Sequence, residues 1–300
     1  MSNIELFTSH TNVFGGKQQP FEKASYIVFG VPFDATSSYR NGARFMPDAV
    51  RKASLNIETY SFRSAKDFED ISLCDVGDLD ATLETKQTLD MCKAVAEDVW
   101  ASGKTPVAIG GEHLITLGIL KGLNDRAKNT AVVSFDAHLD LRKEFLGVKL
   151  SHTTFMRLVN EQVKPSKIIE VGTRSVCQEE LDYAKKSKID VISTQEIRSQ
   201  GALQISQKLK EKLAAYENLY LSIDMDILDP AFAPATQNPE ADGICTGDLL
   251  DIVCSLCDKK VVGFDVVEIA PVYDEGISAI AAAKIIFEVL CHIEKSKESH

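Results

Sequence analysis

The sequence predicts an α/β protein in which a mainly parallel sheet of about eight strands lies between two layers of helices. Short apolar runs rich in Val and Ile alternate with amphipathic stretches along the chain. Such strand–helix alternation is typical of parallel sheets covered by helices. Some runs are apolar at every position, as expected for strands buried on both faces. Because no linker, repeat or low-complexity tract interrupts the pattern, we expect a single domain over residues 1–300.

Strands and helices are expected in alternation. We expect strands near residues 25–30, 71–74, 106–109, 131–135, 167–171, 189–192, 218–223 and 262–267. We expect helices over 84–101, 177–187, 203–215 and 246–257, with a closing helix near 277–294. Further helices should begin near Pro47, since proline favours a first helical turn, and at His113. Because right-handed crossovers join parallel strands, their carboxyl ends should meet at one edge of the sheet.

Composition and charge narrow the class of protein. The 44% hydrophobic and 26% charged residues are ordinary for a globular chain. A net charge of −11 argues against a nucleic-acid or anionic-membrane partner and favours cationic ligands. The start, MSNIELFTSH, lacks the basic and apolar regions of a signal peptide, and no apolar stretch is long enough to span a bilayer. We therefore expect a cytoplasmic protein.

The seven scattered cysteines are expected to be reduced thiols, as in cytosolic proteins. Cys254 and Cys257 form a CxxC, which could indicate zinc binding or redox chemistry. No second CxxC accompanies it in the sequence, and the surrounding LLDIVCSLCDKK has helical periodicity. We therefore favour two cysteines on one buried helix face.

The stretch AVVSFDAHLDLR (131–142) carries three potential metal ligands at the end of an apolar run. Asp136, His138 and Asp140 are spaced by two, and side chains two apart in an extended backbone point the same way. The three can therefore converge on one point. Carboxyl ends of strands are where open α/β sheets bind ligands. For this triplet alone, a solvated polar loop remains the alternative.

Three other predicted strands deliver potential ligands to the same edge. One ends in GGEH (110–113), where the glycines allow close backbone approach, although His113 could also merely cap or pack. Another ends in Asp224 and Asp226, and the last delivers Glu268. Carboxylates that are buried together need a compensating positive charge. Since no Lys or Arg stands beside them in the sequence, we expect a pair of divalent cations.

In combination, these motifs resemble the ureohydrolase family of arginases and agmatinases. The resemblance rests on GGEH (110–113), SFDAHLD (134–140) and SIDMDILDPAFAP (222–234), and extends from FGVPFD (29–34) to VEIAP (267–271). It implies an arginase-like αβα sandwich around an eight-stranded parallel sheet, two Mn²⁺ per subunit and a homo-oligomer, trimeric or hexameric. It also implies hydrolysis of a small cationic guanidino substrate. Agmatine, cleaved to putrescine and urea in polyamine metabolism, is the expected one.

The resemblance also implies a role for each ligand. One metal would be held by His113, Asp136, Asp140 and Asp224, and the other by His138, Asp136, Asp224 and Asp226. Asp136 and Asp224 would then bridge the metals. Carboxylates with imidazoles suit manganese better than a thiolate-seeking metal, and zinc remains an alternative. Two cations roughly 3.5–4 Å apart activate a bridging water for attack on the guanidinium carbon.

Two further residues match functional residues of the family. His152, in LSHTTF, matches its proton-shuttling histidine, and Glu268 matches the glutamate that binds the guanidinium group. A surface histidine and a strand-end salt bridge are the ordinary alternatives. The candidate catalytic residues are therefore His152, Glu268 and Asp140, and the candidate substrate-binding residues are Glu268, Asn238 and His152.

The chain departs from the family pattern at a few positions. The loop PATQNPEADG (234–243) stands where the family commonly has PGTGTPEPGG, so that Gln237 replaces a glycine and Asn238 a threonine. Met46 and Ala35 also stand at usual glycines. Because a Cβ is costly where φ is positive, we expect the backbone to differ at those two positions.

The preferred substrate is agmatine over arginine. Arginases hold the carboxylate of the amino acid with Asn and Ser between the last aspartate of DAHxD and the shuttling histidine. Here LRKEFLGVKLS (141–151) has no Asn, and its only Ser is beside His152. Arg142, Lys143 and Lys149 could nevertheless attract a carboxylate.

Other functions remain as alternatives. A sister ureohydrolase would act on arginine, guanidinobutyrate, N1-aminopropylagmatine or formiminoglutamate. A two-metal phosphoesterase should surround its site with Lys or Arg, and Glu268 would repel its substrate. A catalytically silent metal-binding protein is suggested only by the altered 234–243 loop.

Overall fold

A nine-stranded sheet forms the centre of the computed structural model, which describes residues 2–9 and 12–298. In sheet order the strands are β1 (Thr8–Ser9), β5 (Leu73–Leu79), β2 (Tyr26–Gly30), β6 (Thr105–Ile109), β11 (Val261–Val267), β10 (Asn218–Asp224), β7 (Thr130–Phe135), β8 (Lys167–Thr173) and β9 (Asp190–Ser193). All neighbours pair in parallel except β1, which pairs antiparallel with β5. The predicted parallel sheet is confirmed, with one short strand added at an edge.

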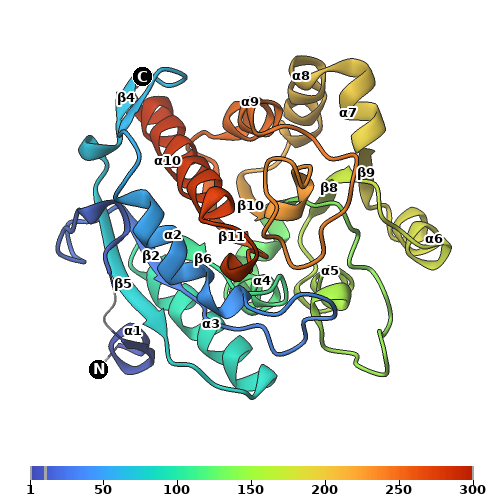
Figure 1. Cartoon of the computed structure of the whole chain (residues 1–300), viewed down its shortest axis with the longest axis horizontal. Coiled ribbons are helices and arrows are strands. Elements are labelled where there is room, and N and C mark those ends of the chain that lie inside the picture. The colour runs from blue at the N-terminus through green and yellow to red at the C-terminus, as the bar shows by residue number, and fades with distance from the viewer. Residues whose placement is uncertain (1, 10–11, 299–300) are drawn as a thin grey trace.

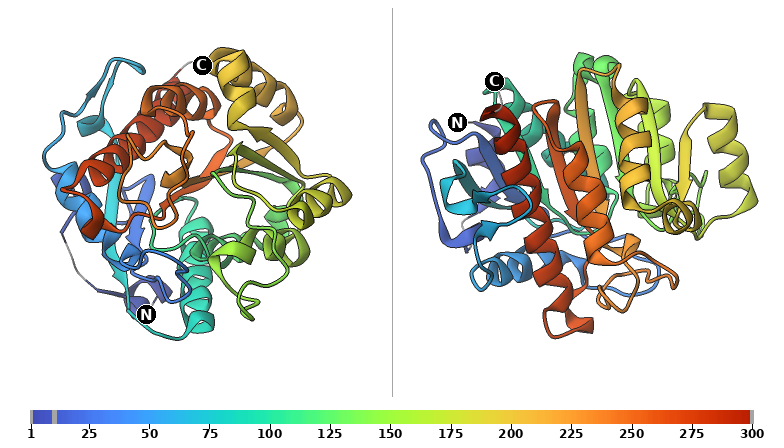
Figure 2. Two further views of the ribbon diagram at one scale, coloured as in Figure 1. Left: turned by 45° about the vertical axis from the view of Figure 1, so that its right-hand side comes forward. Right: turned by 90° about the horizontal axis from the view of Figure 1, so that it is seen from above.

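Helices cover both faces of the sheet (Figures 1 and 2). One apolar core contains residues of α2 (Met46–Ser54), α7 (Thr194–Gln200), α8 (Ala202–Leu213), α9 (Thr246–Leu256) and α10 (Ile277–Glu298). The other contains residues of α1 (Asn3–Phe7), α3 (Thr85–Ala101), α4 (Ile115–Lys121), α5 (Phe155–Leu158) and α6 (Gln178–Ser187). Within β7, Val133 and Phe135 enter the first core and Val132 the second. Since successive side chains of a strand point to opposite faces, the protein has the predicted three layers.

The strand predicted over 71–74 is wrong in extent, because it runs over Leu73–Leu79. Its second half contains Asp75 and Asp78, which break the apolar pattern. The fully buried Arg51 of α2 compensates both carboxylates. Its Nε and Nη2 donate to Asp75 at 2.7 and 2.9 Å, and its Nη1 pairs with Asp78. A strand with acidic residues is therefore stable here because a distant helix supplies the opposite charge.

The remaining differences from the predicted order are small. Strand β1 and helix α7 are additions, as is a hairpin of β3 (Tyr60–Ser61) and β4 (Lys66–Asp67). Helix α4 begins at Ile115 rather than at His113, whereas α2 begins beside Pro47 as expected. Within the described ranges, no helix combines the length and the apolar character needed to cross a membrane.

Candidate metal and substrate site

The predicted ligands meet at the carboxyl ends of four adjacent strands in the middle of the sheet. His113 follows β6, and Glu268 follows β11. Asp224 ends β10 and Asp226 follows it, while Asp136, His138 and Asp140 follow β7. Ligand atoms of His113, Asp136 and Asp224 lie within 4.8 Å of one another, as do those of Asp136, His138 and Asp226. Asp140 joins them, with its Oδ2 at 3.7 Å from Nδ1 of His113. All six predicted ligands are therefore neighbours, and Asp136 belongs to both groups.

Backbone N–H groups orient three of the aspartates. Oδ1 of Asp136 accepts from the backbone N–H of His138 at 2.6 Å. Oδ1 of Asp224 accepts from the backbone N–H of Asp226 at 2.8 Å, and Oδ1 of Asp226 from that of Ala137 at 3.0 Å. The second oxygen of each faces a histidine. Oδ2 of Asp136 and of Asp224 lies 3.0 and 3.1 Å from Nδ1 of His113, and Oδ2 of Asp226 lies 2.9 Å from Nδ1 of His138. The fold thus directs one free oxygen of each carboxylate into the cluster.

His113 is held through its other ring nitrogen. Its Nε2 lies 2.9 Å from the hydroxyl of Ser222, which donates to Asp265 at 2.7 Å. Because that hydroxyl hydrogen is used, Ser222 accepts from Nε2–H, so that the neutral imidazole has its lone pair on Nδ1. Nδ1 is buried and makes no hydrogen bond, despite its nearness to Asp136. A hydrogen bond at the far nitrogen is how metal-binding histidines are held, so the residues present fit a metal ion.

The electrostatics of the cluster call for added positive charge. Burial, followed by the charges of neighbouring carboxylates, raises the pKa of Asp140 and of Asp224. Burial opposes the imidazolium form of His113, but the nearby Asp136 carboxylate outweighs it and raises the pKa of His113 to about 9. The pKa of His138 is raised in the same way by Asp226 and Asp136. Protons on the histidines thus stand in for a cation, and divalent ions fit this donor set.

Glu268 presents an unused carboxylate oxygen at the same place. Its Oε1 accepts from the backbone N–H of His113 at 2.6 Å, whereas its buried Oε2 has no hydrogen-bond partner. Burial raises the pKa of Glu268 to about 8. Both Glu268 and Asp140 have positive φ angles, 73° and 49°, which residues other than glycine rarely adopt. Their conformations aim two carboxylates at one cavity.

This cavity, of about 420 Å³, opens over the cluster. Its walls include all the predicted catalytic and substrate-binding residues, namely Asp140, His152, Asn238 and Glu268. His152 lies in the 3₁₀ turn His152–Thr154 and is 4% exposed. Burial, and then the positive charges of His138 and His113, lower the pKa of His152 to about 4. Its imidazole is therefore neutral at physiological pH.

Sequence reasoning missed several residues of the cavity wall, among them Ser38, Glu180 and Glu240. Ser38 follows β2 and Glu240 lies in the 234–243 loop, so the position of each after a strand was the signal that could have identified them. Glu180 belongs to helix α6, and no pattern placed it near the site. Of the basic residues of the 141–151 segment, only Arg142 lines the cavity, and its Nε lies 3.9 Å from Glu180. Lys149 is exposed outside it.

Of the departures from the family pattern, Gln237, Asn238, Met46 and Ala35 do not have a positive φ, whereas Asp242 of the 234–243 loop has a φ of 72°. Gln237 is buried, and its Oε1 accepts from the backbone N–H of Ala43 at 3.2 Å. Oδ1 of Asn238 lies 3.3 Å from the hydroxyl of Ser38, within hydrogen-bond reach. Met46 has an ordinary helical φ of −56°, and Ala35 does not have a positive φ either. The positive φ that would have penalised these two side chains is therefore not present.

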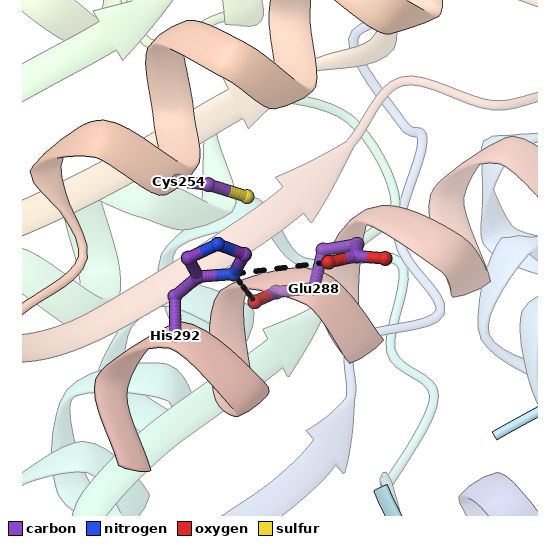
Figure 3. A group of neighbouring side chains, drawn as sticks. All are labelled: Cys254, Glu288 and His292. Carbon is purple, nitrogen blue, oxygen red and sulfur yellow. Dashed lines mark hydrogen bonds and ion pairs between the residues drawn. The ribbon is translucent and has the colours of Figure 1, made fainter. Parts of the chain in front are cut away.

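A second group of potential ligands lies between α9 and α10, at Cys254, Glu288 and His292 (Figure 3). Here the chain itself compensates the carboxylate. Glu288 accepts from the hydroxyl of Ser61 at 2.6 Å and pairs with Lys284 at 3.0 Å. Nδ1 of His292 donates to the backbone carbonyl of Glu288 at 2.7 Å. We assign this group to helix packing.

The cysteine pattern agrees with that assignment. Cys254 lies within α9 and Cys257 ends it, both are buried, and all seven cysteines are free. Burial raises the pKa of both thiols, so neither has the character of a reactive thiolate. Packing of two cysteines at one end of a helix is the interpretation that the structure supports.

Comparison with known proteins places this site in a family. A model of the Arginase family matches residues 24–292. An agmatinase from Halalkalibacterium halodurans is 36% identical over 284 residues, which cover 93% of this chain and 95% of that protein. An N(1)-aminopropylagmatine ureohydrolase from Thermococcus kodakarensis is 33% identical over 270 residues, covering 89% and 90%. The crystal structure of the agmatine ureohydrolase of Thermoplasma volcanium has a TM-score of 0.87 and 34% identity, covering 94% of each chain. The chain therefore belongs to the Arginase family, a family of hydrolases that depend on two metal ions.

Proposed function

We propose that the protein hydrolyses agmatine to putrescine and urea, as a step of polyamine metabolism. The observation that carries the proposal is the cavity itself. It combines a buried His/Asp cluster, a free carboxylate oxygen on Glu268 and further acidic residues in its lining. These features suit a substrate with a guanidinium group at one end and an ammonium group at the other. The names of the relatives support the same substrate.

The six His/Asp residues would hold two Mn²⁺ ions. His113, Asp136, Asp140 and Asp224 would bind one ion, and His138, Asp136, Asp224 and Asp226 the other. When bound, such a pair supplies an acidified water as nucleophile and stabilises the negative charge that develops on the reacting group. The mixture of carboxylates and imidazoles supports manganese, with zinc as its competitor.

Glu268 and His152 would perform the steps that fall to the protein. Oε2 of Glu268 is free to accept fork-like hydrogen bonds from a guanidinium group, whose charge favours the ionised carboxylate. His152, neutral at rest, can take up a proton and deliver it to the leaving amine. Asn238 lies at the cavity wall, where its amide can position the substrate chain.

The charges that line the cavity support agmatine over arginine. Glu180 and Glu240 are among the lining residues, and of the described lining residues Arg142 is the only lysine or arginine. Nε of Arg142 lies 3.9 Å from Oε2 of the buried Glu180, which offsets part of its charge. The carboxylate of arginine would lose water without gaining a free partner, and a loss of about 3 kcal/mol corresponds to about 100-fold in kcat/KM. The same acidic lining would also suit an aminopropylated agmatine, which is the second candidate.

Assembly and compartment belong to the same proposal. A trimer or hexamer is expected from the family, and its mass can be measured by analytical ultracentrifugation. The seven free cysteines support a reducing compartment such as the cytoplasm.

The test is kcat/KM for urea release from agmatine and from arginine under identical manganese loading. Agmatine should be preferred by about 100-fold if the desolvation argument holds. Equal values, or a preference for arginine, would overturn the assignment. In that case Arg142→Ala should abolish the arginine activity, whereas the control Lys149→Ala, outside the cavity, should not.

A further inference from the structure

Two hydroxyl groups of the loop after β2 hold the imidazole of His152 from opposite sides. Oγ1 of Thr36 lies 3.3 Å from Nδ1 of His152, and Oγ of Ser38 lies 3.1 Å from Nε2. The backbone N–H of His152 also donates to Oγ1 of Thr36 at 3.1 Å. Thr36 therefore contacts the histidine twice and determines both its place and its ring orientation.

Glu112 fixes the direction of these hydrogen bonds. This carboxylate is fully buried and accepts from the hydroxyl of Thr36 at 2.5 Å and from its backbone N–H at 2.7 Å. A threonine hydroxyl has one hydrogen and two lone pairs. Its hydrogen goes to Glu112, and one lone pair accepts the backbone N–H of His152. While Glu112 is ionised, the second lone pair can only accept, so Nδ1 is then the protonated nitrogen.

A close backbone contact brings Glu112 to this position. Glu112 donates its backbone N–H to the carbonyl of Phe33 at 2.8 Å. A Cβ on Gly111 would lie 1.8 Å from that carbonyl oxygen, so only glycine permits the approach. This confirms the close contact expected from the glycines of GGEH, and it shows that the contact joins the loop of Thr36 to that of Glu112.

We propose that Thr36 and Glu112 are positioning residues that hold His152 as its Nδ1–H tautomer, so that Nε2 is the atom that exchanges the proton. This inference rests on the proposed function, in which His152 carries a proton to the leaving amine. Nε2 takes the proton released when water adds to the guanidinium carbon. It then gives that proton to the nitrogen that leaves with the electron pair of the broken C–N bond, and the neutral imidazole is restored.

Ser38 and Asn238 accommodate both protonation states of Nε2. While Nε2 has a lone pair, the Ser38 hydroxyl can donate to it. Once Nε2 carries the proton, it can donate to Ser38, whose hydroxyl then turns to Oδ1 of Asn238 at 3.3 Å. Asn238, which replaces the usual threonine of the family, thus acts through Ser38, because it accepts the Ser38 hydroxyl hydrogen whenever Nε2 is protonated.

Kinetics of three variants separate positioning from a merely structural role. Thr36→Val removes the hydroxyl at nearly constant shape, and we expect kcat to fall about 10²-fold, within the range that acid–base catalysis contributes. KM and metal content should stay unchanged. Thr36→Ser keeps the hydroxyl and should restore most of kcat. The control Thr130→Val removes a buried hydroxyl far from the site, one that donates to the carbonyl of Arg126, and should have normal kcat.

The tautomer can be measured directly by solid-state ¹⁵N NMR of the zinc-loaded, histidine-labelled protein. His152→Asn identifies the resonances, which should show Nδ1 protonated and Nε2 unprotonated in the wild type. Glu112→Gln supplies an amide that can donate to Thr36, and should move the proton toward Nε2. A wild type protonated on Nε2, or Thr36→Val with normal kcat, would overturn the inference. If instead no guanidino compound released urea, the proposed function would fail while the tautomer measurement still decided the positioning.

Discussion

Two clusters of buried charge in this protein are compensated in opposite ways. In the first, Arg51 donates to Asp75 and Gly77 and pairs with Asp78. In the second, at the carboxyl ends of the central strands, the structure records no ion pair with a lysine or arginine among the described residues. Of the described side chains that can carry positive charge, His113 and His138 are the ones recorded beside those carboxylates, and they are charged only while they hold protons.

The difference lies in whether the positive charge can leave. A guanidinium group stays protonated at every physiological pH, so the carboxylates of the Arg51 cluster always have their counter-charge and have no need of a bound cation. An imidazolium can release its proton to a competing cation, so the second cluster is open to exchange. Buried acidic groups thus indicate a ligand site only where the chain supplies no permanent counter-charge. The comparison predicts different responses to substitution, metal and pH.

The largest effect is expected for Asp136→Ala. Asp136 belongs to both ligand groups, so its loss should reduce metal content from two ions per subunit to at most one. Because the ion pair contributes several kcal/mol to catalysis, urea release should fall roughly 10³-fold or more. The control Asp78→Asn, in the Arg51 cluster, should keep both ions. Metal content is measured after dialysis with manganese, and two ions bound to Asp136→Ala would contradict the bridging role.

A smaller effect, and one on stability alone, is expected for Arg51→Met. Loss of the guanidinium leaves buried carboxylates unpaired, which should lower the free energy of unfolding by about 3–5 kcal/mol. Urea denaturation with and without manganese measures this loss. The folded fraction should still bind two ions per subunit. If the difference in stability between wild type and variant disappeared with manganese, the two clusters would not be independent.

The smallest effect concerns pH. The raised pKa of His113, about 9, means that the metal-free imidazole is protonated at pH 7 and must release that proton when metal binds. Apparent manganese affinity should therefore rise as pH rises toward 9, by about tenfold per unit for each proton displaced. Competition with a chelator between pH 6.5 and 8.5 measures the slope. A flat profile would show that protons do not occupy the cluster.

Much of the fold could be predicted because its signals are local. Each parallel strand is an apolar run, and the strands expected over 131–135 and 218–223 agree with β7 and β10 within one residue. Strand β5 was harder because the apolar pattern fails at Asp75 and Asp78, whose counter-charge comes from Arg51 in another element. Strand β1 has only two residues, too few for any periodicity.

The candidate site divides in the same way. The spacing of two in DAHLD correctly brought Asp136, His138 and Asp140 to one site, but the extended backbone expected for it is not what the structure has. Strand β7 ends at Phe135, residues 137–138 form a bend, and Asp140 has a φ of 49°. The contacts of Thr36 with Glu112 join segments 76 residues apart through a glycine contact. No repeating pattern in the sequence predicts a contact between such distant segments, so Thr36 and Glu112 could be identified as partners only from the three-dimensional structure.

The place of the ligands within the strand order has a consequence for how the protein opens. The strands that carry the proposed ligands, β6, β11, β10 and β7, are neighbours, and each has a strand on both sides. None of them can separate from the sheet alone, so amide hydrogen exchange in these strands should require cooperative unfolding, which bound metal opposes. The edge strands β1 and β9 carry no predicted ligand and can open locally. Fraying at the edges and release of metal are therefore separate events, and the first can occur many times without the second.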